Sequence, residues 1–122
     1  MSIRGLIIKK EWLDLILSGE KTIELRSRMT NIRGRILLVE SGSGMIMGAC
    51  NIIDCVEYFT LASFEHQKPR HHAHAGFWGR YKYGWCIEIG SEKRFSTPIP
   101  YNHPQGAVIW VKFGESDFGI EL

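Results

Sequence analysis

The feature that most constrains the fold is a series of short apolar segments of strand length, separated by turn residues. These strand-like segments lie at 2–9, 22–26, 35–41, 45–58, 85–90, 94–100 and 107–113. They do not alternate regularly with helical segments, as the strands of a parallel α/β fold would. The sequence therefore predicts an α+β fold, in which a strongly bent, mostly antiparallel sheet or small barrel carries one or two short helices.

The clearest helical pattern is KEWLDLILSG, residues 10–19. Its apolar residues fall on one side, and Gly19 is well placed to end the helix in a left-handed conformation. A second, short helix is predicted over 60–67, with Thr60 as its N-cap. Residues 68–84 are expected to form a glycine-rich loop, and the segments at 85–90 and 94–100 to pair as a hairpin.

Length and composition place the chain among ordinary globular proteins. Its 122 residues favour a single domain over 1–122, and 44% hydrophobic with 23% charged residues exclude disordered and membrane-spanning classes. The N-terminus reaches lysines before a signal-peptide apolar region can form, so we expect a cytoplasmic protein without a membrane partner. The net charge of +2 permits a polyanionic partner. No feature specifies an oligomeric state.

The segment GEKTIELR, residues 19–26, concentrates charge at the start of a predicted strand. Residues three apart on a strand point to opposite faces. Lys21 and Glu24 therefore share a face only if the strand begins at Thr22 and Lys21 lies in the turn after Gly19. We predict this arrangement.

Strand alternation then divides residues 22–26 between two faces. Ile23 and Leu25 are expected to pack inward against the helix, near Trp12 and Ile16. The opposite face carries a polar row formed by Thr22, Glu24 and Arg26.

The polar row and Lys21 are suited to a ligand. Lys21 and Arg26 offer donors to phosphate or carbonyl oxygens, and an ionised Glu24 accepts from an amino group or a ribose hydroxyl. Ser41, in the turn after the next strand, is small enough to let a ligand approach. The alternative is a solvated edge strand blunted by charge.

The segment PRHHAHAGFWGRYKYGW interleaves basic and aromatic residues. Such a mixture can follow a phosphate backbone while rings stack on unpaired bases, which is typical of single-stranded RNA binding. Trp78, Arg80 and Tyr81 are the candidates for this contact. Trp85 begins a strand and is expected to cover the core.

The histidines at 66, 71, 72 and 74 do not have the fixed ligand spacing of zinc sites, so we predict no metal site and no cofactor. Their protonation near about pH 6–7 would instead add positive charge to the loop. The three cysteines lack C-x-x-C spacing and are expected to be buried thiols.

The stretch WLDLILSGEKTIELRSR…RGRILLVES resembles the ASCH domain (activating signal cointegrator homology). The G-x-K-x-x-E motif of that family corresponds to Gly19, Lys21 and Glu24, and Arg26 and Arg28 follow it. MGACNIIDCVEY and TPIPYNHPQGAVIWVKF are similar to later family segments, so the resemblance covers nearly the whole chain except the 67–84 loop.

The resemblance implies a PUA-like β-barrel with a cleft lined by the motif Lys and Glu, and association with RNA or a nucleotide-like small molecule. It adds Arg28 to the candidate binding residues. Some relatives are amidohydrolases of acetylated cytidine that use a Lys and a Thr three positions later, where this chain has Glu24. We therefore predict RNA or nucleotide binding. One alternative is a small hydrolase of a modified nucleoside or RNA, with Lys21 and Glu24 as catalytic residues, and another is a protein-interaction module.

Overall fold

The computed structural model describes residues 3–114 of the chain. The elements, in order, are β1 (Ile3–Ile8), α1 (Lys10–Leu17), β2 (Ile23–Arg26), β3 (Gly34–Glu40), β4 (Met45–Glu57), α2 (Leu61–His66), α3 (Lys68–His71), the 3-10 turn η1 (Ala75–Phe77), β5 (Tyr83–Ile87), β6 (Lys93–Pro100) and β7 (Trp110–Phe113). No helix within residues 3–114 is long and apolar enough to cross a bilayer.

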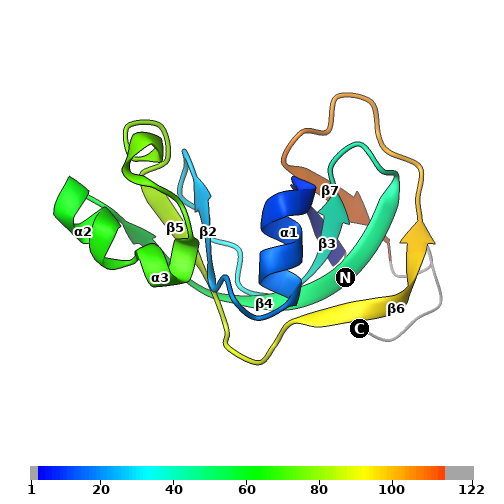
Figure 1. Cartoon of the computed structure of the whole chain (residues 1–122). Helices are drawn as coiled ribbons and strands as arrows, with labels where there is room; N and C mark the ends of the chain where they lie inside the picture. Colours follow the sequence, from blue (N-terminus) through cyan, green and yellow to red (C-terminus); the bar gives the residue numbers. More distant parts are fainter. Residues whose placement is uncertain (1–2, 115–122) are drawn as a thin grey trace.

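The strands form one bent sheet (Figure 1). Its order is β2-β5-β4-β3-β1-β7, and β6 pairs separately with β4. β1 and β3 run parallel, whereas the other pairs within residues 3–114 are antiparallel. The predicted α+β class with a bent, mostly antiparallel sheet is confirmed. Over the described residues the sheet stays open rather than closing into a barrel.

β4 is the longest described strand and connects the two halves of the molecule (Figure 1). Its first part pairs with β6 and its last part with β5. The predicted hairpin of the segments at 85–90 and 94–100 is therefore wrong. Because β4 has 13 residues, β5 and β6 can pair with different parts of it, and they need not pair with each other.

The largest core cluster lies between α1 and the sheet. Leu13, Ile16 and Leu17 of the helix pack on inward residues of β3, β4 and β5. The next residues of β3, Leu37 and Val39, point to the other face, where β7 and the β6 region cover them. Burial on both faces explains the unbroken apolar run of β3.

Residues 58–78 form a small lobe that covers the end of the sheet next to β2. The predicted second helix is present, and the Ser63 amide donates to the Thr60 hydroxyl at 3.1 Å, which confirms the cap. The segment 68–84, predicted as a loop, also contains α3 and η1. Phe64, Tyr58 and Ala73 form the buried centre of this lobe. Such short helices depend on this tertiary packing, which their own sequence does not reveal.

Gly48 lies at an irregularity in β4, as the sequence predicted. The register shifts beside it in the pairings with both β3 and β6. A methyl group at this position would collide with the Lys93 carbonyl oxygen and lie 2.7 Å from Leu17 Cδ2. Only a residue without a side chain fits where these backbones cross.

Gly48→Ala is expected to lower the free energy of unfolding by about 1–3 kcal/mol, because backbone atoms must move to admit the methyl group. Gly79→Ala is the matched control, since no atom lies within 4 Å of its added Cβ. Urea unfolding of both variants measures the difference. Equal stability of the two variants would contradict the close approach of Gly48 to the Lys93 backbone.

Candidate functional site

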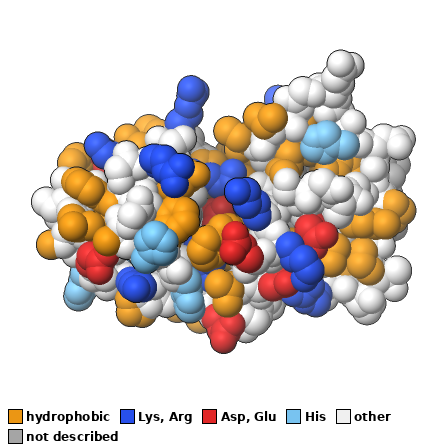
Figure 2. Space-filling model, turned by 45° about the horizontal axis from the view of Figure 1, so that its top comes forward, with side chains coloured by type: hydrophobic (Ala, Val, Ile, Leu, Met, Phe, Trp, Pro, Cys, Tyr) orange, Lys and Arg blue, Asp and Glu red, His pale blue; other side chains and the backbone are white. Residues whose placement is uncertain are grey.

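A cavity of about 330 Å³ opens between α1, β2 and the loops that precede β5 and β7. Figure 2 shows this face of the molecule hollowed in the middle, with basic and acidic side chains gathered there. Three aromatic residues, Trp12, Phe77 and Tyr81, form part of the wall. The charged lining residues are Lys9, Glu11, Lys21, Glu24 and Arg26.

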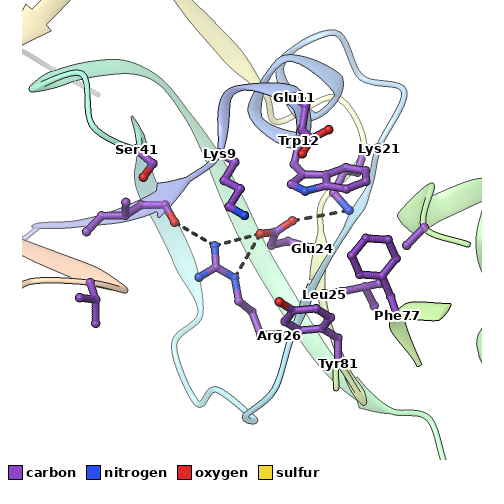
Figure 3. A pocket seen from close by; sticks show the side chains of 13 residues that line it. Lys9, Glu11, Trp12, Lys21, Glu24, Leu25, Arg26, Ser41, Phe77 and Tyr81 are labelled. Carbon is purple, nitrogen blue, oxygen red and sulfur yellow. Dashed lines mark hydrogen bonds and ion pairs between the residues drawn. The ribbon is translucent and has the colours of Figure 1, made fainter. Parts of the chain in front are cut away.

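Glu24 lies between two cations in the cavity (Figure 3). Its Oε1 is 3.5 Å from Lys21 Nζ, and its Oε2 accepts from Arg26 Nε at 3.1 Å and Arg26 Nη2 at 2.9 Å. Lys21 is 2% exposed and Glu24 6%, so this ion triad is largely withdrawn from water. At such burial the charges interact more strongly than an exposed pair would.

The turn after α1 brings Lys21 onto the face of Glu24. Gly19 has a φ of +85°, the left-handed conformation that the sequence predicted. The Lys21 amide then donates to the Leu15 carbonyl at 3.0 Å, and β2 begins at Ile23. Lys21 precedes the strand, so the rule that residues three apart face opposite sides does not apply to it.

The two faces of β2 are arranged in the opposite sense to the prediction. Glu24 lines the same cavity as Trp12, on the side of α1. Leu25 also reaches the cavity wall, but it packs against the cluster of Tyr58, Phe64 and Ala73 and does not join the cluster under the helix. The apolar face of β2 is buried by the lobe of residues 58–78, whose packing the sequence pattern did not predict.

The Lys21 ammonium is held from three sides. Besides the contact with Glu24, it donates to the His71 carbonyl oxygen at 2.7 Å and lies 5.2 Å from the centre of the Trp12 ring. Burial lowers the pKa of Lys21, and the charge of Glu24 acts in the opposite direction.

His71 is a buried structural histidine. Its Nε2 lies 2.7 Å from the Phe64 carbonyl oxygen, and its Nδ1 accepts from the Ala73 amide at 3.0 Å. These partners assign the neutral tautomer with its proton on Nε2. Burial lowers the pKa of His71, which favours the neutral ring in the folded protein.

This burial predicts a pH dependence of stability. Below about pH 6.5 the unfolded chain binds a proton at His71 that the folded protein does not. The free energy of unfolding should therefore fall as the pH drops through this region, by at most about 1.4 kcal/mol per pH unit. Urea unfolding between about pH 7.5 and 5.5 measures the slope.

His71→Gln should remove this part of the slope, whereas the exposed His66, changed to Gln, should leave it. An unchanged slope in His71→Gln would contradict the assignment.

Of the other predicted binding residues near the motif, one lines the cavity and two do not. Ser41 lines the cavity with the ion triad. Thr22 does not line it, and its hydroxyl accepts from Arg70 Nε at 3.1 Å. The exposed Arg28 also lies outside the cavity lining, and its carbonyl accepts from Trp85 Nε1 at 2.9 Å. This bond and burial in the main cluster confirm Trp85 as a core residue.

Of the three candidates from the aromatic loop, only Tyr81 is a cavity-lining residue. Trp78 packs instead against the buried centre of its own lobe, and its Nε1 donates to the Tyr58 carbonyl at 3.4 Å. The guanidinium carbon of the exposed Arg80 lies 5.7 Å from the centre of the Tyr81 ring, beside the cavity wall.

The sequence interpretation missed Lys9 and Glu11 as lining residues, and it assigned Trp12 and Phe77 no site role. The parallel pairing of β1 and β3 explains why Lys9 belongs here. It brings the ends of both strands to one edge, where the Ser41 amide donates to the Ile8 carbonyl at 2.8 Å. Residues that follow these strands, Lys9 and Ser41, therefore meet at the cavity. No local pattern in the sequence indicates a parallel pair.

Metal ligation finds no support in the described part of the chain. Residues 3–114 contain no group of three or more His, Cys, Asp or Glu residues that could hold an ion. Cys50 and Cys86 are buried as predicted, whereas Cys55 is only half-buried. Burial raises the pKa of the Cys50 thiol to about 12. A thiol with so high a pKa is a core residue and no nucleophile.

Comparison with known proteins identifies related sequences and folds. The sequence model of the ASCH domain matches residues 6–105. The crystal structure of ASCH from Zymomonas mobilis is similar with a TM-score of 0.67 at 13% identity, over 95% of this chain and 90% of that one. A serine-to-alanine mutant of the Zymomonas protein gives 0.68 at 15% identity, with 95% and 91% covered.

A tyrosine-to-phenylalanine mutant of the same Zymomonas protein gives a TM-score of 0.67 at 12% identity, with 95% and 93% covered. No curated protein matches the chain significantly. At these identities the likeness establishes the fold, and it confirms the predicted PUA-like architecture.

Proposed function

Because this chain belongs to the ASCH domain family, we propose that it binds RNA or a nucleotide-like small molecule, with one nucleotide unit in the cavity around Lys21, Glu24 and Arg26. The cavity volume of about 330 Å³ falls at the lower end of the range for small-molecule sites. Such a volume suits one nucleotide and excludes a base pair, so an RNA ligand must present an unpaired base.

The aromatic wall supports binding of a base. Trp12 and Phe77 meet edge to face with ring centroids 6.1 Å apart, and Tyr81 lies 5.9 Å from Phe77. In Figure 3 the rings of Trp12 and Phe77 lie on the Lys21 side of Glu24, and the Tyr81 ring lies below Glu24, next to Arg26. Stacking on aromatic side chains contributes about 1–3 kcal/mol per base and tolerates any base.

The opposite side of the cavity supports binding of a phosphate. Figure 3 shows Lys9, Arg26 and Ser41 on this side of Glu24. The bonds of Arg26 to other described residues use Nε and Nη2, which leaves its Nη1 to donate to a ligand. Three cations against two carboxylates in the lining favour an anionic group.

The observation that carries the proposal is the buried ion triad beneath aromatic walls. Removing three charges from water costs a large desolvation free energy, which their mutual attraction need not offset. Stability alone therefore does not explain the arrangement. Both carboxylate oxygens of Glu24 contact cations. A carboxylate so engaged is poorly placed to act as a general base, which favours binding over hydrolysis.

Calorimetry with nucleoside monophosphates and a short single-stranded RNA tests the proposal. Arg26→Gln should weaken mononucleotide binding by about 10–100-fold, because a charged hydrogen bond contributes about 1.5–3 kcal/mol. Arg28→Gln makes the same charge change at an exposed side chain outside the cavity and should change the affinity by less than about twofold.

Two results would contradict this function. One is a wild-type protein that binds neither mononucleotide nor RNA. The other is a folded Arg26→Gln variant that binds as well as wild type. Mass spectrometry of the same mixtures would reveal turnover, and a cleaved product would establish the hydrolase alternative.

A further inference from the structure

Two short segments, residues 20–22 and residues 70–72, lie side by side and are joined by a run of hydrogen bonds. The motif that carries Lys21 is thus tied to the end of α3 and to His72, the residue that follows this helix. The bonds are His72 Nε2 to the Glu20 carbonyl at 2.7 Å, Lys21 Nζ to the His71 carbonyl at 2.7 Å, the Thr22 amide to the Arg70 carbonyl at 2.9 Å and Arg70 Nε to the Thr22 hydroxyl at 3.1 Å.

The backbone of the second segment has an unusual conformation at its end. His72 has a φ of 62°, and it is the one non-glycine residue with positive φ within residues 3–114. A left-handed conformation costs free energy for such a residue and persists only where the surroundings hold it. Here the His72 amide donates a hydrogen bond to the Lys68 carbonyl at 2.8 Å, and the His72 ring is hydrogen-bonded to the Glu20 carbonyl.

This conformation ends α3 and leaves the His71 carbonyl without a helical partner. That carbonyl oxygen accepts from Lys21 Nζ inside the protein. An ammonium group has three donors. His71 and Glu24 take two of them, and the remaining side of the ammonium lies by the Trp12 ring, which lines the cavity where a ligand would bind.

We propose that residues 70–72 are a positioning element for Lys21, and that His72 sets the place of the Lys21 ammonium in the cavity through its left-handed backbone and its bond to Glu20. The flexible four-carbon side chain of Lys21 would otherwise reach many positions. The effect on ligand affinity rests on the proposed function, whereas the effect on Lys21 itself does not.

His72→Gly tests the proposal. Glycine keeps the left-handed conformation at no cost and is the favoured residue after a helix, so the variant should fold. It removes the ring that bonds Glu20. We expect nucleotide affinity to fall about fivefold, the loss typical of one hydrogen bond. We also expect the pKa of Lys21, followed by NMR titration of its side chain, to rise as the ammonium gains water.

The controls separate positioning from general stability. His66→Gln changes an exposed histidine and should alter neither the affinity nor the Lys21 titration. His72→Gln restores a side-chain donor and should recover part of both effects. Thr22→Val removes the acceptor of Arg70 Nε at the same shape, and it should shift the Lys21 titration in the same direction as His72→Gly.

A folded His72→Gly protein with unchanged Lys21 titration and unchanged affinity would overturn the proposal. So would a loss of stability without either change. If the wild type binds no nucleotide, the proposed function fails, and the Lys21 titration still decides whether residues 70–72 position this side chain.

Discussion

Glu24→Gln is expected to lower the free energy of unfolding by about 3–5 kcal/mol, which is the cost of removing one partner from a buried ion pair. The substitution keeps the size of the side chain and removes its charge. Lys21 and Arg26 then face each other without the carboxylate between them. Their repulsion and the lost charged hydrogen bonds act in the same direction. Urea unfolding at neutral pH measures the loss.

Two further variants make this result specific. Glu11→Gln makes the same chemical change in the same cavity at an exposed residue and should alter stability by less than about 0.5 kcal/mol. Adding Lys21→Met to Glu24→Gln removes one unpaired charge and should recover at least about 1 kcal/mol. A loss below about 1 kcal/mol in Glu24→Gln would show that water reaches the ion triad.

Phe64→Ala should cost about 3–5 kcal/mol, because it empties the centre of the lobe of residues 58–78. Phe64 is completely buried, and its ring lies 4.3 Å from that of His71 and 5.6 Å from that of Tyr58. Its carbonyl also accepts from His71. Loss of this ring should therefore loosen His71, and with it the carbonyl that holds Lys21.

Phe59→Ala is the matched control, since Phe59 is 79% exposed and its loss should change stability by less than about 0.5 kcal/mol. Thermal and urea unfolding of both variants give the comparison. Similar stability of Phe64→Ala and Phe59→Ala would mean that the lobe adds nothing to the cooperative fold.

The sequence predicted the local elements near the site well. The helical period of 10–17, the left-handed Gly19 and the alternation of β2 are all short-range features, and each follows from side-chain spacing or backbone sterics. The same reasoning predicted that Lys21 and Glu24 share a face, which their 3.5 Å contact confirms. Local rules were sufficient because every residue involved lies within one turn and one strand.

The remaining features of the site depend on tertiary contacts. Which side of β2 meets α1 is determined by the lobe that covers the other side, and which aromatic residues reach the cavity is determined by α3 and η1. Phe77 and Trp78 are neighbours in the sequence, yet only Phe77 lines the cavity. Composition predicted an aromatic, basic segment without distinguishing between these two residues.

The pairing of β1 with β7 has a consequence for the order of folding. Ile3 pairs with Phe113, so the two ends of the described chain meet in the sheet. Contacts of such long sequence separation form slowly, because a large loop must close first. The cavity takes Lys9 from one end of that loop and Val108 from the other. A growing chain therefore cannot complete the cavity until the segment with Val108 and β7 has been synthesised, and a bound ligand would favour the sheet with β1 and β7 paired over any shorter intermediate.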